Sequence, residues 1–180
     1  MRVGFLLFCL FPFILRAQRV SFSVGAGLPN LDTRYLPAFD GMSMGGVTRS
    51  AVVTGSLMCR VTRRLEAGVT TTYGSVSASY SEPGSVGFSG FSGKLEDWTI
   101  MATLQRTFPM GRRVSAYIKT ALGAHLWTQS YTEPGASADL PVLAKQVCGG
   151  VRLRCLRRAG LFVEAGYGEY VVLGGIFIHV

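Results

Sequence analysis

The stretch that decides the fold is Val114–Trp127, which reads VSAYIKTALGAHLW. Its residues separate into two alternating sets, one of them largely apolar. The apolar set comprises Val114, Ala116, Ile118, Thr120, Leu122, Ala124 and Leu126, and the other comprises Ser115, Tyr117, Lys119, Ala121, Gly123, His125 and Trp127. A helix would mix the two sets around its axis, whereas a β-strand places them on opposite faces. The pattern therefore predicts a strand with one apolar face.

The same period of two recurs along the chain. Ala51–Val61 and Trp98–Phe108 repeat it, and no segment shows a convincing amphipathic helix. We predict eight strands, at about residues 19–27, 49–61, 65–80, 95–108, 113–128, 142–156, 161–170 and 171–180.

The predicted connections alternate between short and long. Tight turns are expected at 62–64, 109–112 and 157–160, and longer connections at 28–48, 81–94 and 129–141. The last connection, near Glu169–Tyr170, is short and breaks the alternation. Two long connections begin with similar strings, YSEPGS at 80–85 and YTEPGA at 131–136, and Pro-Gly favours a turn. This arrangement predicts an up-and-down meander with turns at one end and loops at the other.

The composition suits strands that face lipid. The 180 residues include 48% hydrophobic and only 16% charged residues, with a mean hydropathy of +0.33, which excludes a disordered chain. No apolar run after residue 17 approaches the roughly 20 residues that a membrane-spanning helix needs. Alternating strands joined by short turns and long loops are typical of outer-membrane barrels, which close because lipid cannot satisfy a free sheet edge. The sequence thus predicts an all-β fold, an eight-stranded antiparallel up-and-down transmembrane β-barrel filled by side chains.

Residues 1–17, MRVGFLLFCLFPFILRA, predict a cleaved signal peptide. Arg2 supplies a positive start, residues 4–15 form an apolar run, and Ala17 is a small residue suited to cleavage. Cleavage would remove Arg2 and Arg16, which lowers the Lys and Arg count from 18 to 16 and the net charge from +8 to +6. We therefore expect a barrel domain at 18–180 in the bacterial outer membrane.

On these features the chain resembles the small eight-stranded outer-membrane β-barrel family. That family includes the barrel domain of OmpA, OmpX and the outer membrane protein beta-barrel domain proteins of the Bacteroidetes. The resemblance covers 18–180 and rests on the signal ending in Ala-Gln, the loop alternation, strings such as AGYGEY at 165–170 and the amphipathic last strand. It implies membrane lipid and lipopolysaccharide as surroundings and the barrel-assembly machinery as a partner. Such barrels usually end in an aromatic residue, whereas this chain ends in Phe177-Ile178-His179-Val180.

Basic residues gather near the short turns, and acidic residues near the long loops. The basic group comprises Arg60, Arg63, Arg64, Arg106, Arg112, Arg113, Arg152, Arg154, Arg157 and Arg158. We interpret these arginines as interfacial anchors. Nucleic-acid binding is not expected, because the arginines flank apolar strands and lack interleaved exposed aromatic residues.

Strand parity places some charged side chains inside the barrel. They are Arg60, Glu66, Lys119, Arg152, Arg154 and Glu164. A charge shielded from water must be paired, so we expect an interior ion-pair cluster, with Arg60 beside Glu66 and Glu164 beside Arg152 or Arg154. We interpret the cluster as a plug of paired side chains. The alternative is a narrow or gated conduction path.

No motif predicts a catalytic residue, a cofactor or a metal site. His125 is followed by LWTQS, which lacks the His-x-Ser spacing expected of an outer-membrane lipid A deacylase. Cys59, Cys148 and Cys155 have no metal-ligand spacing, and three thiols cannot all pair within one chain.

Any binding role would fall to loop residues. The candidates are Tyr35, Phe39, Met42–Met44, Phe88 and Phe91, for which local packing is the competing interpretation. We predict a non-enzymatic outer-membrane barrel of structural or surface-interaction type. The alternatives are an outer-membrane enzyme acting on lipid A or peptides, and a soluble secreted lipocalin-like barrel with its apolar faces turned inward around a ligand.

Overall fold

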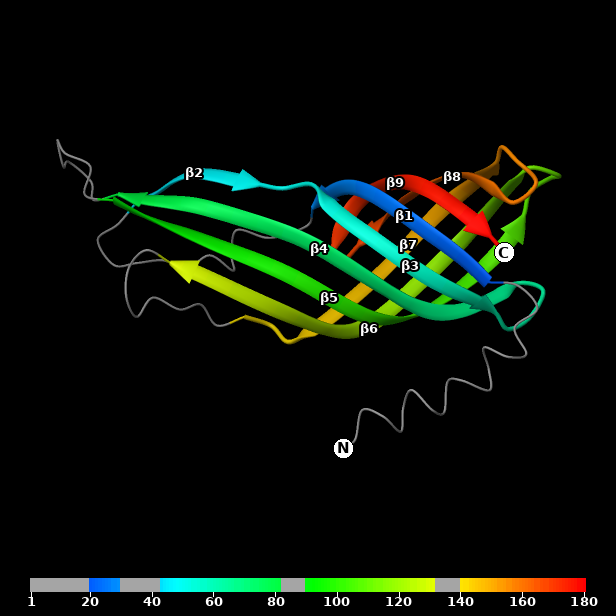
Figure 1. Ribbon diagram of the computed structural model, residues 1–180, viewed down its shortest axis with the longest axis horizontal. Helices are drawn as coiled ribbons and strands as arrows, with labels where there is room; N and C mark the ends of the chain where they lie inside the picture. The colour runs from blue at the N-terminus through cyan, green and yellow to red at the C-terminus, as the bar shows by residue number, and fades with distance from the viewer. Residues whose placement is uncertain (1–19, 30–42, 82–89, 132–139) are drawn as a thin grey trace, which may run out of the picture.

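The computed structural model describes residues 20–29, 43–81, 90–131 and 140–180, so the predicted signal peptide lies outside the described residues (Figure 1). Its strands are β1 (Val20–Pro29), β2 (Ser43–Arg49), β3 (Val52–Arg60), β4 (Leu65–Ser81), β5 (Gly90–Pro109), β6 (Val114–Tyr131), β7 (Leu143–Arg154), β8 (Ala159–Tyr167) and β9 (Tyr170–His179). Among the described residues there is no helix that is both long and apolar enough to cross a membrane.

The sheet closes into an antiparallel barrel. β1 pairs with both β3 and β9, and a β4–β5 pairing completes the ring. β2 and β3 both pair with β4 and are separated only by Ser50 and Ala51, so they act as two parts of one barrel strand. The nine strands therefore form an eight-stranded barrel, which confirms the predicted fold class.

The period of two predicted from the sequence is the alternation between the two faces of the wall. On β6, Ile118, Leu122 and Leu126 are 53–59% exposed on the outer face. Tyr117 and Lys119, on the inner face, are buried. The lipocalin-like alternative is therefore wrong, because it places the apolar faces inside, whereas here the outer face is the apolar one.

The barrel wall is much taller on one side than on the other (Figure 1). β4, β5 and β6 continue past the ends of β7, β8 and β9, and β2 pairs with the far part of β4. We call this four-stranded part, formed by β2 and the distal ends of β4, β5 and β6, the extension. Its inner face holds a buried apolar cluster of Val76, Ala78, Tyr80 and Leu95.

Two stretches predicted as loop are strand. Residues 43–48, predicted as loop, form all of β2 but its last residue, Arg49, and β5 begins at Gly90 rather than near residue 95. Both lie in the extension, where outward residues such as Ser77 and Ser79 on β4 are polar. The apolar alternation that marks the rest of the barrel is therefore missing there, although the strands continue.

The outer face changes character at one row of paired residues. Tyr73 pairs with Trp98, and Trp98 pairs with Leu126. The Tyr73 and Trp98 rings lie 4.8 Å apart between centroids, and Trp98 is 50% exposed. Toward the short turns the outward residues are mostly apolar, as with Ile100 and Leu104 on β5. Beyond the row they are polar or charged, as with Lys94 and Glu96 on β5.

The final connection is as short as the sequence predicts. Only Gly168 and Glu169 separate β8 from β9. Gly168 has a φ of +135°, and a Cβ there would lie 2.2 Å from the backbone oxygen of Lys145, so only glycine fits without strain. This tight connection ends the short side of the wall and turns Glu169 into the interior, where it is 9% exposed.

Candidate functional site

The interior holds a polar network that crosses the lumen. In its lower part, toward the short turns, the Glu66 carboxylate on β4 lies 3.7 Å from Arg60 and 3.2 Å from Arg152 Nη1 on β7. Gln105 on β5 donates to Glu66 at 2.9 Å and accepts from Arg152 at 3.0 Å. Because β4 and β7 stand on different sides of the barrel, the Arg152–Glu66 pair crosses the lumen at this depth.

The upper part of the network is centred on Glu164 on β8, which is 3% exposed. Its carboxylate accepts from Lys119 Nζ at 2.5 Å and from the Tyr117 hydroxyl at 2.7 Å, both on β6. Tyr170 on β9 donates a further hydrogen bond, and the Cys148 thiol lies 3.5 Å away. A carboxylate with this many donors is fully satisfied, as a buried charge requires.

Tyr117 joins the two parts of the network. Its hydroxyl donates to Glu164, while the Arg152 guanidinium lies 4.7 Å from the centre of its ring. The ring lies over Gly150, whose added Cβ would come within 2.5 Å of it. The absence of a side chain at Gly150, which pairs with Glu164, leaves room for the tyrosine.

The pairing expected for Glu164 is wrong. The sequence placed it beside Arg152 or Arg154, but its partner is Lys119, because Tyr117 occupies the space between Glu164 and Arg152. Arg154 is exposed at the barrel end and forms no ion pair with a described residue. The structure thus brings Arg60, Glu66 and Arg152 together and Lys119 and Glu164 together. Gln105, Tyr117 and Tyr170 were missed, although they share the inward parity.

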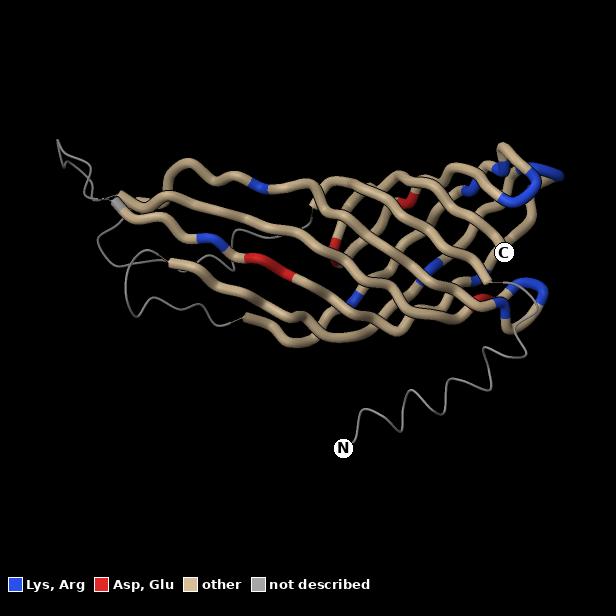
Figure 2. The backbone as a smooth tube through the Cα atoms, viewed as in Figure 1, with Lys and Arg blue, Asp and Glu red and all other residues tan. Residues whose placement is uncertain are grey.

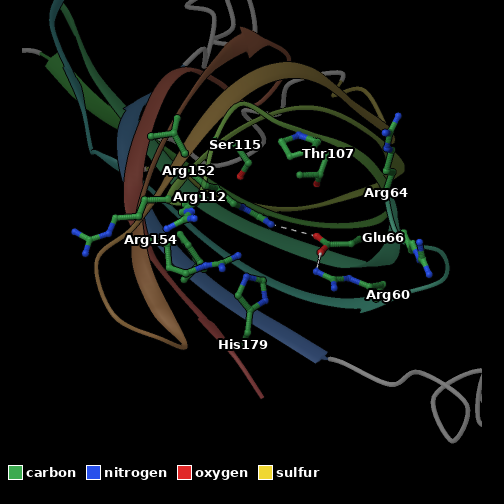
Figure 3. Close-up of a pocket in the computed structure, with 15 residues that line it drawn as sticks. Arg60, Arg64, Glu66, Thr107, Arg112, Ser115, Arg152, Arg154 and His179 are labelled. Atoms are coloured by element: carbon green, nitrogen blue, oxygen red, sulfur yellow. Dashed lines mark hydrogen bonds and ion pairs between the residues drawn. The ribbon is translucent and has the colours of Figure 1, made fainter.

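Positive charge surrounds the lumen mouth at the short-turn end (Figure 2). A cavity of about 300 Å³ opens there, and among its lining residues are Arg60, Arg63, Arg64, Arg112, Arg152 and Arg154 (Figure 3). Glu66 lies at its inner end and is held by Arg60 and Arg152. The mouth is therefore a concave and predominantly positive surface, which attracts anions and repels cations.

A second polar cluster, missed by the sequence analysis, lies near the other end of the lumen. His125 on β6 faces two carboxylates, with Nδ1 2.8 Å from Asp97 Oδ2 on β5 and Nε2 3.7 Å from Glu169 Oε1 in the β8–β9 connection. Burial raises the pKa of the Glu169 carboxyl to about 7; His125 opposes this rise and Asp97 adds to it. In the described part of the chain neither ring nitrogen of His125 forms a hydrogen bond with a hydroxyl group.

The predicted loop-binding residues have different outcomes. Tyr35, Phe39, Met42 and Phe88 lie outside the described residues. Phe91 is not in a loop but on β5, where its ring stacks on Tyr80 with centroids 4.8 Å apart. Met44 is on β2 and is 39% exposed. For Phe91 the competing interpretation, local packing, therefore describes the structure.

Comparison with known proteins supports the fold and nothing finer. No family model matches the chain, and no curated protein matches it. A solved structure described as "De novo design of transmembrane beta-barrels" is similar, with a TM-score of 0.50 and 13% sequence identity. The match covers 92% of this chain and 98% of that one. At this identity the similarity concerns the fold alone.

Proposed function

We propose that the protein is an outer-membrane β-barrel of structural or surface-interaction type, closed to ions and held in lipid by the outer face of its strands. The observation that carries this proposal is the apolar outer face. On β6 it runs from Val114 to Leu126. At about 3.3 Å per residue and a tilt of about 45°, this stretch spans about 28 Å, close to the hydrocarbon thickness of a bilayer.

Aromatic and basic residues stand where the boundaries of such a band require them. Tyr73 and Trp98 lie at the loop-side boundary of the tall wall, and Tyr167, 69% exposed, ends β8 on the short side. On the other boundary the Arg106 guanidinium lies 5.4 Å from the centre of the Phe108 ring. Aromatic girdles and arginines that reach toward headgroups are the usual interfacial anchors. In the outer membrane, lipid and lipopolysaccharide would surround this band.

The direction of insertion follows from the connections. The short turns and their arginines face the periplasm, and the extension stands outside the membrane. The barrel-assembly machinery would insert the chain in this direction. Outside, the row of Ser75, Ser77, Ser79 and Ser81 and the open edge of β2 form the surface that a partner would meet. This geometry supports a surface-interaction role better than transport.

The interior network supports the view that the barrel does not conduct. Arg152 reaches across to Glu66, and Tyr117 and Lys119 hold Glu164 in the next layer. An eight-stranded interior is only wide enough for side chains, and here these side chains are bonded to each other. An ion would have to break charged hydrogen bonds to pass.

Membrane insertion is tested through the two tryptophans. Trp98 faces outward and Trp127 packs on His125 with centroids 5.0 Å apart. We expect brominated acyl chains to quench the fluorescence of Trp98 in a Trp127→Phe variant. They should leave Trp127 nearly unchanged in the matched Trp98→Phe variant. Equal quenching, or recovery of the protein from cells without detergent, would contradict the proposal.

The closed interior is tested in planar bilayers. The wild type and a Glu96→Ala control, whose altered residue lies on the extension, should give no steady conductance. Replacing both Glu66 and Arg152 by alanine removes the pair that spans the lumen and should produce resolvable openings. Steady openings of the folded wild-type protein would refute a closed barrel while leaving its membrane insertion intact.

A further inference from the structure

Three potential metal ligands from separate parts of the chain meet near the loop-side end of the lumen. Asp97, His125 and Glu169 each offer one ligand atom, and these atoms all lie within 4.8 Å of one another. β5 and β6 supply the first two, and the β8–β9 connection supplies the third. Asp97 and Glu169 are 3% and 9% exposed, so the cluster is not a solvated group of surface acids.

The two His125 contacts differ in a way that points to an ion. The 2.8 Å contact between Nδ1 and Asp97 Oδ2 is a hydrogen bond, with Nδ1–H as the donor when a metal takes Nε2. The 3.7 Å between Nε2 and Glu169 Oε1 is too long for a hydrogen bond. Two ligands bound tetrahedrally at about 2.1 Å from one Zn²⁺ stand about 3.4 Å apart, so a shift of a few tenths of an ångström would suffice.

A second observation is independent of these distances. Buried polar atoms without a hydrogen-bond partner among the described residues concentrate around this cluster. Three of them lie here, Asp97 Oδ1, Thr99 Oγ1 and Gln146 Nε2, whereas Arg152 Nε belongs to the lower network. Thr99 is the cross-strand partner of His125, and Gln146 Oε1 accepts the Glu169 backbone N–H at 2.5 Å. Native proteins rarely leave such atoms unsatisfied, so a hydrated ligand is expected to contact them.

We propose that Asp97, His125 and Glu169 form a binding site for a divalent transition-metal ion of the Zn²⁺ class. His125 Nε2 and Glu169 bind the ion directly. Asp97 fixes the imidazole tautomer through Nδ1 and adds negative charge, as carboxylates behind metal-bound histidines do. Mixed imidazole and carboxylate ligands suit Zn²⁺ and its neighbours better than Ca²⁺ or Mg²⁺, which favour oxygen alone.

The bound ion would link the short side of the wall to the tall side. The β8–β9 connection and strands β5 and β6 are not neighbours in the barrel. Among the described residues, the ion pair seen to link Glu169 to either strand is its 3.7 Å contact with His125. Metal binding would thus close the lumen at its loop side, above the network that contains Glu164.

The test uses the full detergent-solubilised protein with Zn²⁺ and Co²⁺ as probes. In a Trp98→Phe variant the one remaining tryptophan is Trp127, which stacks on His125. Co²⁺ bound at Nε2 should quench its fluorescence saturably with one ion per chain. It should also give the visible absorption bands of nitrogen and oxygen coordination. Zn²⁺ should displace Co²⁺ and restore the emission.

Matched variants separate this site from other ligands. Glu169→Gln should abolish the saturable quenching, and Asp97→Asn should weaken binding by about 10- to 100-fold. His179→Ala, which removes the other histidine, and Cys155→Ser, which removes an exposed thiol, should leave it unchanged. Unsaturable quenching, or equal binding by folded Glu169→Gln protein, would overturn the proposal and identify the cluster as a hydrogen-bonded polar group only.

Discussion

Two ion pairs of nearly equal length differ in burial, and this difference predicts different responses to the same substitution. Lys119 Nζ lies 2.5 Å from Glu164 inside the barrel, where their side chains are 5% and 3% exposed. Lys94 Nζ lies 2.6 Å from Glu96 on the outer face of the extension, where their side chains are 52% and 31% exposed. Glu164→Gln and Glu96→Gln therefore remove the same negative charge, the first from a buried ion pair and the second from an exposed one.

We expect Glu164→Gln to destabilise the barrel by about 3–5 kcal/mol, because it leaves the buried Lys119 ammonium without a counter-charge. This corresponds to a change of roughly 10²- to 4 × 10³-fold in the folding equilibrium constant. The glutamine keeps the size of the side chain, so little of the loss comes from a cavity. Glu96→Gln should cost about 0–1 kcal/mol, because water screens an exposed pair.

The assay is urea-induced folding and unfolding in vesicles, followed in both directions by the heat-sensitive gel migration of a closed barrel. A double-mutant cycle with Lys119→Met isolates the pair, and the double variant should recover much of the stability lost by Glu164→Gln. If Glu164→Gln costs no more than Glu96→Gln, or if the cycle gives no coupling, the buried pair does not hold the interior together.

Two further substitutions test the outer face and the packing of the interior. Leu104→Arg places a charge in the middle of the apolar band, opposite Ala67 and Thr120, and should cost about 2–4 kcal/mol, whereas Thr128→Arg, beyond the band, should cost about 0–1 kcal/mol in the same urea assay. Equal costs would argue against lipid at this face. Gly150→Leu should displace Tyr117 from Glu164, because even a Cβ at Gly150 would lie 2.5 Å from the tyrosine ring. We expect lower stability and a shifted Tyr117 signal in aromatic NMR spectra, and an unchanged signal would refute the contact.

The barrel itself could be predicted from the sequence because lipid imposes a strong pattern. Every second residue of Val114–Trp127 faces outward, and the large apolar members of that set, Val114, Ile118, Leu122 and Leu126, are exposed in the structure. Ser43–Arg49 could not be recognised in this way, because all seven of its residues are exposed and it contains Gly45 and Gly46. A strand that has left the membrane lacks the pattern, and pairing with β4 alone defines it.

The side-chain pair that the sequence predicted correctly, Arg60–Glu66, lies across one tight turn, whereas the pairing expected for Glu164 across the turn at 157–160 was wrong. Arg60 and Glu66 are direct cross-strand partners next to the β3–β4 turn, so their contact follows from local register. Glu66 and Arg152 are 86 residues apart, and only closure of the barrel brings them together. The Lys119–Glu164 pair depends on the Gly150 position and on the Tyr117 ring that fills the space beside it. Parity assigns a face to each residue, but the shear of the closed sheet decides its neighbours.

The Asp97–His125–Glu169 cluster depends on the one connection that breaks the alternation of short and long loops. A long loop after β8 would carry Glu169 away from the lumen, whereas the Gly168–Glu169 connection holds it 9% exposed against the tall wall. The positive φ of Gly168 and the hydrogen bond from the Glu169 N–H to Gln146 fix this placement. The sequence shows no metal-ligand spacing for this cluster, because the nearest two of the three residues are 28 positions apart. The short connection is therefore the structural reason that a buried carboxylate faces His125 and Asp97 at the loop side of the lumen.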